Sequence, residues 1–352
     1  MHGPQIPKLD KTETPMIRRI PSLACLIAVL MFVRVARSDD APPAPPQVLV
    51  VVGAGGSEEY QTAFATWADR WKSTTGLLDG ASYHEIGREE GQSDSSDKDR
   101  LNERLAELSD LKAEAVWIVL IGHGTFDGKA AKFNLRGPDV SAEELNGWIE
   151  PMKSPLIVVN CASASGPFIN RLSAAGRTIV TATKSGQEQN FARFGDYLSQ
   201  AISNIAADLD HDDEVSLLEA FLSASDQVAK FYEAENRIAT EHALIDDSGD
   251  RLGTPATMFQ GTTAVAVPQP KAARDGGVAA RRVIFQSPQA VVLTPAQRES
   301  RAAIEAEIDR LKLRKSELGT DQYFAQLEPL MLQLAELYAA AEAENSDESQ
   351  RE

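Results

Sequence analysis

The sequence is poor in cysteine, with two among 352 residues, and only 6% of its residues are aromatic. Two cysteines cannot form the disulfide framework that holds small secreted domains together. A chain of this length can instead bury a core of its own, and 43% of its residues are hydrophobic. The composition therefore predicts a globular protein that does not need disulfide bonds to be stable.

Positive charge is also scarce. The chain has 35 lysines and arginines against 52 aspartates and glutamates, and its formal net charge is −17. Proteins that bind nucleic acid concentrate positive charge on one face or along one helix. The sequence has no such basic stretch, so we expect no nucleic-acid partner.

A signal peptide is expected over residues 1–38. Arg18-Arg19 precede an apolar stretch over 20–33, and the small residues Ala36 and Ser38 suit cleavage after Ser38. The apolar stretch is shorter than the ~20 residues that span a bilayer, although an uncleaved membrane anchor is the alternative. We therefore expect an exported protein, periplasmic or secreted, with no stable membrane insertion after cleavage.

Cleavage leaves Cys161 as the single cysteine, because Cys25 lies in the apolar stretch of the signal peptide. A lone thiol in an exported protein has no intramolecular disulfide partner. It is either a buried, unreactive residue or a reactive one.

Strands and helices alternate over the first half of the chain, after a proline-rich linker at 39–46. Runs of β-branched residues predict buried strands, and apolar residues at helical spacing predict helices. In chain order we expect a strand over 47–52, a helix from Ser57 to about Trp71, a strand over 82–86, a helix over 99–111, a strand over 116–121, a loop to Pro138, a helix from Ser141, a strand over 156–159, a helix over 167–174 and a strand over 178–182. This alternation is typical of an α/β fold with a mostly parallel sheet between helices.

The rest of the chain is predicted to be largely helical. Residues 190–241 carry helical patterns interrupted by an acidic loop, and the domain over 47–262 then closes. A polar linker with short strand-like runs follows over 263–294. Apolar residues then repeat at intervals of three and four on either side of Gly319-Thr320, which predicts a helical hairpin or coiled coil over 295–345. These helices can pack on each other or mediate a homo-oligomer.

Two of the buried strands end in residues with catalytic chemistry. The run Val116–Ile121 opens into Gly122-His123-Gly124, and the run Leu156–Val159 opens into Asn160-Cys161. Ligands of parallel sheets collect beyond the carboxyl ends of the strands, so His123 and Cys161 are expected at one edge. A base beside a thiol is the smallest machinery for nucleophilic acyl transfer.

The order of these segments resembles that of the caspase/legumain group (clan CD) of cysteine peptidases. Ile121–Thr125 (IGHGT) is similar to the histidine segment of the group, and Asn160–Gly166 (NCASASG) is similar to its cysteine turn. The resemblance covers roughly residues 47–261. It implies a caspase-like, or hemoglobinase-like, α/β peptidase domain.

Two further segments are similar to the legumain branch of that group. Val52–Gly56 followed by Tyr60 is similar to the loop after the first strand, and Thr181–Thr183 leading to Phe194–Tyr197 is similar to the substrate-pocket segment. This similarity implies a substrate pocket that contains Thr183, Lys184, Glu188 and Asp196.

The chain differs from the legumain pattern at two positions. Gly55 stands where legumains have an asparagine that helps orient the histidine, and Gln61 stands where they have a pocket arginine. The resemblance therefore implies neither the orienting partner of His123 nor the residue preferred at the cleaved bond.

The predicted mechanism is attack by the Cys161 thiolate on a peptide carbonyl. His123 would keep the thiol ionised and protonate the leaving amine, and the backbone amides of Gly124 and Cys161 would hold the oxyanion. A serine hydrolase is disfavoured, because the chain has no G-x-S-x-G elbow and Ser163 and Ser165 lie beyond the cysteine. Activity is thus expected to depend on Cys161 and not on Ser163, without an organic cofactor.

The acidic segment 208–219 matches the twelve-residue calcium loop of EF-hands. Oxygen-bearing side chains stand at alternate positions and a glutamate ends the loop, so the predicted ligands are Asp208, Asp210, Asp212, Glu214, Ser216 and Glu219. Asp213 occupies the position that usually requires glycine. We expect a structural Ca²⁺ ion here, and an acidic helix start without metal is the alternative.

The sequence as a whole predicts an exported cysteine endopeptidase that acts on a peptide or protein substrate. The alternative is a catalytically inactive caspase-like module, in which the calcium loop and the helical tail serve binding or assembly.

Overall fold

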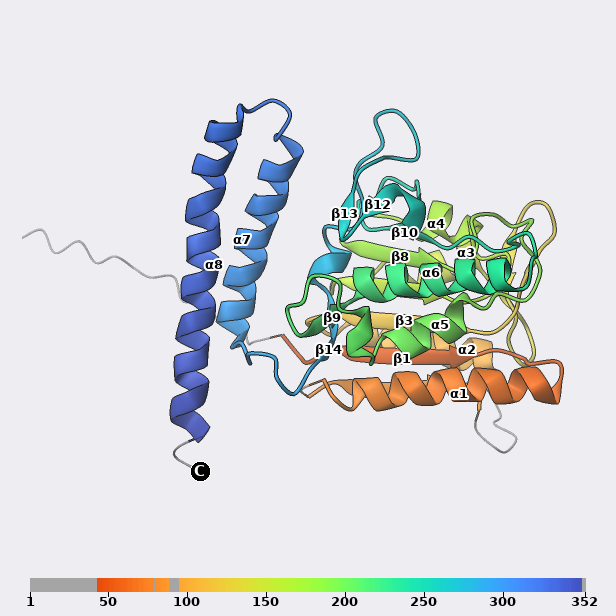
Figure 1. The fold of residues 1–352 in the computed structure, drawn as a ribbon. Helices are drawn as coiled ribbons and strands as arrows, with labels where there is room; N and C mark the ends of the chain where they lie inside the picture. Colours follow the sequence, from red (N-terminus) through yellow and green to blue (C-terminus); the bar gives the residue numbers. More distant parts are fainter. Residues whose placement is uncertain (1–42, 79, 89–94, 350–352) are drawn as a thin grey trace, which may run out of the picture. The chain divides into compact units, whose positions relative to one another are not determined.

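The computed structural model of this protein describes residues 43–78, 80–88 and 95–349 (Figure 1). The predicted signal peptide and the first residues of the proline-rich linker lie outside these ranges. Among the described helices, none combines the length and apolar character needed to cross a bilayer.

The central sheet has seven strands in the order β11-β10-β8-β7-β3-β1-β2. Its parallel part consists of β1 (Gln47–Val52), β2 (Ser82–Ile86), β3 (Val116–Ile121), β7 (Leu156–Asn160) and β8 (Arg177–Thr181). Every residue of β3 and β7 is buried, as expected for central strands that are covered on both faces. The bounds predicted from the sequence for these five strands agree with those of the structure to within one residue.

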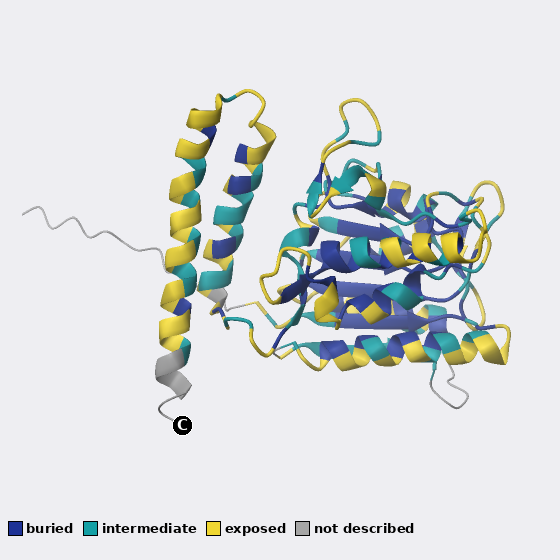
Figure 2. Ribbon diagram, in the orientation of Figure 1, coloured by how far each residue is buried: buried dark blue, intermediate teal, exposed yellow. Residues whose placement is uncertain are grey.

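Helices cover both faces of this sheet. The side chains of α1 (Glu58–Thr75), α5 (Phe194–Ala201) and α6 (Leu217–Ala234) form one core with it, and those of α2 (Asp97–Ser109), α3 (Ala142–Ile149) and α4 (Pro167–Leu172) form the other. Figure 2 shows the buried sheet between exposed helix faces. The predicted α/β fold with a mostly parallel sheet between helices is confirmed.

Two predicted helix starts are also confirmed. The Ser57 hydroxyl accepts a hydrogen bond from the backbone N–H of Tyr60 at 3.4 Å. Ser141 and Glu144 form a reciprocal capping box at the start of α3. Each cap satisfies backbone donors that the first helical turn leaves free.

Several short antiparallel strands were not predicted. A small sheet of β4 (Gly124–Phe126), β5 (Ala131–Phe133) and β6 (Val140–Ser141) occupies the expected loop after β3. In addition, β10 (Leu244–Asp246) and β11 (Thr254–Pro255) extend the central sheet beyond β8. Strands of two or three residues are too short to show a periodic hydrophobic pattern, so the sequence gives no signal for them.

The C-terminal part carries a helical pair, as predicted. The helices α7 (Pro295–Leu313) and α8 (Thr320–Ser349) contact each other, and Arg301 donates a hydrogen bond to the Tyr338 hydroxyl at 3.1 Å. Before them, β14 (Val283–Gln286) pairs with β9 (Glu214–Ser216) in the acidic loop region. The remaining elements are β12 (Phe259–Gln260), β13 (Thr263–Ala264) and the 3₁₀ helices η1 (Ile205–Ala207), η2 (Ala256–Met258) and η3 (Ala279–Arg281).

Two helical glycines test the packing of the core around Cys161. A Cβ atom at Gly195 would lie 2.6 Å from the Cys161 Cβ and 2.7 Å from the Trp67 ring, whereas one at Gly147 would meet nothing within 4 Å. We expect Gly195→Ala to lower the free energy of unfolding by about 1–3 kcal/mol through overpacking. Gly147→Ala should raise it by up to about 1 kcal/mol through helix propensity. Urea denaturation measures both, and equal effects would contradict the packing described here.

Candidate active site

His123 lies in the turn that joins β3 to β4, at the carboxyl end of the parallel strands. Its half-buried ring contacts three aromatic side chains edge-on, with centroid distances of 4.7 Å to Tyr60, 5.1 Å to Phe64 and 6.1 Å to Phe191. Tyr60 and Phe64 belong to α1, so this helix and the turn together set the orientation of the imidazole.

The backbone of Gly55 decides which imidazole nitrogen can act as a base. The Nε2 atom of His123 lies 3.2 Å from the Gly55 carbonyl oxygen. A carbonyl only accepts hydrogen bonds, so Nε2 carries the proton in the neutral ring and Nδ1 is the free acceptor. The backbone carbonyl of Gly55 therefore contacts His123 at the position where the family resemblance implied an orienting asparagine side chain.

The pKa of His123 is lower than the ordinary value of 6.5, because burial disfavours the charged imidazolium. The hydrogen bond to Gly55 opposes this effect in part. The ring is therefore neutral at pH 7, with Nδ1 available to accept a proton.

Cys161 directly follows β7, but its thiol lies in the hydrophobic core. The residue is 1% exposed and packs in the core on the side of α1 and α5. Burial raises the pKa of the thiol to about 12. Within the described part of the chain, no hydrogen bond joins this thiol to His123 or to another group.

The backbone amide of Cys161 is occupied as well. It donates a hydrogen bond to the Leu120 carbonyl at 2.9 Å, which continues the pairing of β3 with β7. The prediction that this amide holds an oxyanion is therefore wrong, because a donor engaged in the sheet is not free for a substrate. The predicted role of the thiol as a nucleophile stays a prediction.

Ser163 is the side chain that connects the two turns at this edge. Its hydroxyl lies 3.3 Å from the backbone N–H of Gly124 and 3.2 Å from the Gly124 carbonyl oxygen. A Cβ atom at Gly124 would lie 2.2 Å from the Ser163 carbonyl oxygen, so only glycine allows this approach. The structure thus brings Gly124, which was predicted for the site, against a serine that the sequence analysis had set aside.

The residue after Ser163 has a strained backbone. Ala164 has a φ of 53°, in the left-handed region that side chains with a Cβ rarely adopt. Its N–H donates to the Glu188 carbonyl at 2.7 Å, which holds the turn in place. Strained positions of this kind cluster at functional sites.

Two of the four residues predicted for the substrate pocket lie in one pocket. Lys184 and Glu188 line a surface pocket of about 580 Å³, together with Gln187, Asn190, Ile238, Ala239, Thr240 and His242. Thr183 does not line it, because its buried hydroxyl accepts from the Gly166 N–H at 3.1 Å. Asp196 does not line it either, and forms an ion pair with Arg70 of α1 at 2.7 Å.

His242 is a pocket residue that the sequence analysis did not single out, because it directly follows the region 190–241 that was predicted to be helical. It lies before β10, outside any helix, and its Nδ1 atom is 2.5 Å from the Glu188 carboxylate. The two residues are 54 positions apart in the sequence. No local pattern could have paired them.

The segment 184–193 connects this pocket to His123. Glu188 of this segment contacts Ala164 through its carbonyl, and Phe191 packs its ring on Tyr60 at 4.8 Å as well as on His123. The pocket, the strained turn and the imidazole therefore belong to one continuous edge of the domain.

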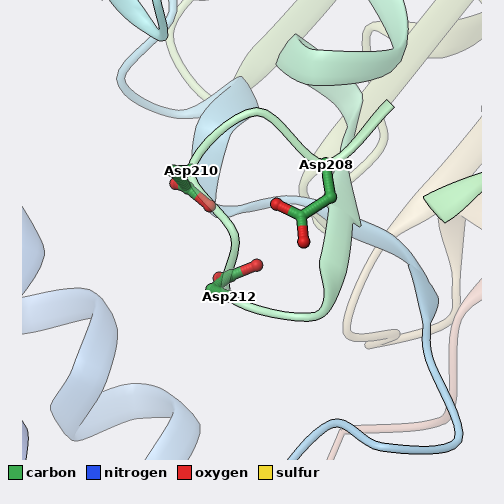
Figure 3. A group of neighbouring side chains, drawn as sticks. All are labelled: Asp208, Asp210 and Asp212. Carbon is green, nitrogen blue, oxygen red and sulfur yellow. The ribbon is translucent and has the colours of Figure 1, made fainter. Parts of the chain in front are cut away.

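The acidic loop forms a second candidate site (Figure 3). Carboxylate oxygens of Asp208, Asp210 and Asp212 lie within 4.8 Å of one another. Burial and neighbouring carboxylates raise the pKa of Asp210, and they raise that of Asp212 to about 7. Asp213 has a φ of 66°, so it adopts the left-handed conformation that glycine usually provides at this position.

The other three predicted calcium ligands have protein partners. Ser216 and Glu219 form the capping box of α6, and Glu219 also accepts from the Leu209 N–H at 2.8 Å. Glu214 lies 2.7 Å from the guanidinium of Arg301 in α7. Of the six predicted ligands, the structure thus brings together the carboxylates of Asp208, Asp210 and Asp212.

No model of a known protein family matches this sequence, and no curated protein matches it. Among solved structures, it is similar to the Drosophila initiator caspase Dronc, with a TM-score of 0.38 and 12% identity over 58% of this chain and 80% of that chain. It is also similar to caspase-1 from Spodoptera frugiperda, with a TM-score of 0.35 and 8% identity over 58% of this chain and 86% of that chain. The legumain branch stays a prediction.

The lowered pKa of His123 makes a prediction for acid stability. The unfolded chain takes up a proton as the pH falls through about 6.5, whereas folded His123 does so only at lower pH. The contribution of this residue is therefore fully present above that pH and is lost as the pH falls below it. We expect NMR titration to place the His123 ring below 6.5 and His123→Gln to flatten the fall of Tm in this window. A midpoint above 6.5 would contradict the burial described here.

Proposed function

We propose that this protein is a peptidase of caspase-like fold, with His123 as its general acid and base. The observation that carries the proposal is the hydrogen bond from His123 Nε2 to the Gly55 carbonyl, which leaves Nδ1 unprotonated at neutral pH. The Gly124 amide, one residue further on, donates to the Ser163 hydroxyl, and it would exchange that partner for the oxyanion of a tetrahedral intermediate. The pocket with Lys184 and Glu188 would receive a substrate side chain on the same edge.

The proposed reaction is hydrolysis through an acyl-enzyme. A nucleophile from the turn after β7 attacks the peptide carbonyl, and His123 accepts its proton and passes it to the leaving amine. Water then attacks the acyl group with the same base. Six of the eight amino acids that line the pocket are polar or charged, so we propose a substrate with a polar side chain at the cleaved bond.

One observation favours a second candidate, a catalytically inactive module of the same fold. Cys161, the single cysteine among the described residues, is buried, its thiol has a pKa of about 12, and its amide is bonded within the sheet. A thiol in that state does not ionise at neutral pH and is a poor nucleophile. If no other nucleophile serves, the domain would act in binding or assembly.

Peptide cleavage separates the two candidates. We expect the full chain to cleave members of a mixed peptide library, detected by mass spectrometry, and His123→Ala to reduce cleavage by ~10²–10⁴-fold, as is usual on loss of a general base. The exposed His211 lies in the acidic loop, so His211→Asn is the matched control and should cleave normally. Absence of cleavage, or equal cleavage by His123→Ala, would favour the inactive module.

We also propose that the acidic loop binds Ca²⁺ as a structural ion. Three carboxylates converge there, and their mutual repulsion is relieved when a hard cation binds between them. Asp208, Asp210 and Asp212 would be the protein ligands, with backbone carbonyls or water completing the usual six to eight oxygens.

Calcium should therefore stabilise the folded protein. Excess Ca²⁺ is expected to raise Tm by several degrees relative to a chelated sample, because a ligand that binds only the folded state stabilises it. Asp212→Asn should remove this shift. Asp226→Asn, a change at an exposed aspartate of α6, should keep it. An identical Tm with Ca²⁺ and with chelator would show that the loop does not need metal.

A further inference from the structure

We propose that Phe191 is a gate between His123 and Cys161 that a polar substrate side chain opens, an inference that rests on the peptidase function proposed above. Phe191 belongs to the loop 184–193 between β8 and α5, and residues of this loop also line the substrate pocket. In the structure the gate is closed.

Aromatic rings connect the imidazole of His123 with the side chain of Cys161. A Cβ atom at Gly195 would lie 2.6 Å from the Cys161 Cβ and 2.7 Å from the Trp67 ring, so these two side chains are neighbours. The centroid of the Phe191 ring lies 6.0 Å from that of Trp67 and 6.1 Å from that of His123. The rings of Phe191 and Trp67 thus form a chain of contacts from the base to the cysteine.

Phe191 is the movable member of this aromatic cluster. Phe64 also contacts both His123 and Trp67, with centroid distances of 5.1 and 5.3 Å, but Phe64 and Trp67 lie in α1 and are 0% and 3% exposed. Phe191 is half-buried and lies outside any helix or strand. Loops of this kind open at a lower free-energy cost than core helices do. A movement of the loop therefore removes the Phe191 ring while α1 keeps the other rings in place.

One end of the loop is fixed by the buried Glu241. This residue is 2% exposed, and its carboxylate accepts hydrogen bonds from the N–H of Arg193 at 2.7 Å and from that of Phe194 at 3.0 Å. The Arg193 guanidinium also lies over the ring of Phe231, 4.1 Å from its centroid. This end is built into the start of α5 and serves as the hinge.

The other end of the loop is held by Glu188, which lies in the substrate pocket. Its carboxylate accepts hydrogen bonds from the N–H of Lys184 at 2.9 Å and from that of His242 at 3.2 Å, and the His242 Nδ1 atom is 2.5 Å away. A polar substrate side chain in the pocket competes with Glu188 for these donors. Because Phe191 follows Glu188 by three positions, release of the carboxylate frees the part of the loop that carries the ring.

The closed gate accounts for the state of Cys161 in the structure. With Phe191 in place, the cysteine is buried and its thiol is protonated. When the ring leaves, the imidazole reaches the thiol, and a nearby base promotes the reactive thiolate. Cys161 is then reactive while a substrate occupies the pocket, and it is protected from other reactions when the pocket is empty.

Alkylation of the native thiol tests the gate without a substrate. We expect iodoacetamide at pH 7 to modify Cys161 at least ~10-fold faster in Phe191→Ala than in the wild type, and His123→Ala to remove most of this gain, because an accessible thiol beside an imidazole forms thiolate. Mass spectrometry of the peptides distinguishes Cys161 from Cys25. The matched control is Phe259→Ala, since Phe259 is also half-buried and packs on the same core.

The outcomes separate a gate from a loss of stability and from the proposed function. Equal alkylation rates in Phe191→Ala and Phe259→Ala, or a gain that does not depend on His123, would overturn the gate. Faster alkylation that depends on His123, in a protein that cleaves no peptide, would support the gate while the peptidase function fails. Urea denaturation of each variant verifies that the rates are measured on folded protein.

The link between the pocket and the gate has its own test. Glu188→Gln should speed alkylation of Cys161 by about 3–10-fold, because a neutral amide holds the donors of the pocket more weakly than a carboxylate does. Glu233→Gln, a change at an exposed glutamate of α6, should leave the rate unchanged. A rate in Glu188→Gln equal to that of the wild type would refute opening of the gate from the pocket.

Discussion

The parallel pairing of β3 with β7 determines where chemistry can occur in this protein. The two strands are neighbours in register, with Leu120 opposite Asn160, and the Cys161 amide extends the ladder by one bond. Neighbouring parallel strands end at the same edge of a sheet, so the turns that follow them must meet. The contact of Gly124 with Ser163 is the direct result, and the proposed site depends on it.

Burial has opposite consequences for the imidazole and the thiol. It lowers the pKa of His123, which keeps the ring neutral and able to accept a proton. It raises the pKa of Cys161, which keeps the thiol protonated. Burial therefore keeps both His123 and Cys161 uncharged at neutral pH.

The acidic loop illustrates how one local pattern can serve two structures. Ser216 and Glu219 fit the spacing of calcium ligands, and they fit equally the spacing of a helix capping box, which is what they form at the start of α6. The aspartates before them lie on an irregular loop and converge instead. The same segment thus combines a helix start with a cluster of carboxylates that favours a cation.

The sequence alone determined the strands of the parallel sheet, the caps at Ser57 and Ser141, and the position of His123 after β3, because each depends on a local pattern of apolar residues or on a single side chain. The tertiary structure alone decided what surrounds the residues after β7. Cys161 is buried beside Gly195 and its amide is bonded within the sheet, whereas the Ser163 hydroxyl bonds to the backbone of Gly124. The Gly55 carbonyl and the Glu188–His242 pair were equally invisible, because contacts between distant segments leave no local pattern.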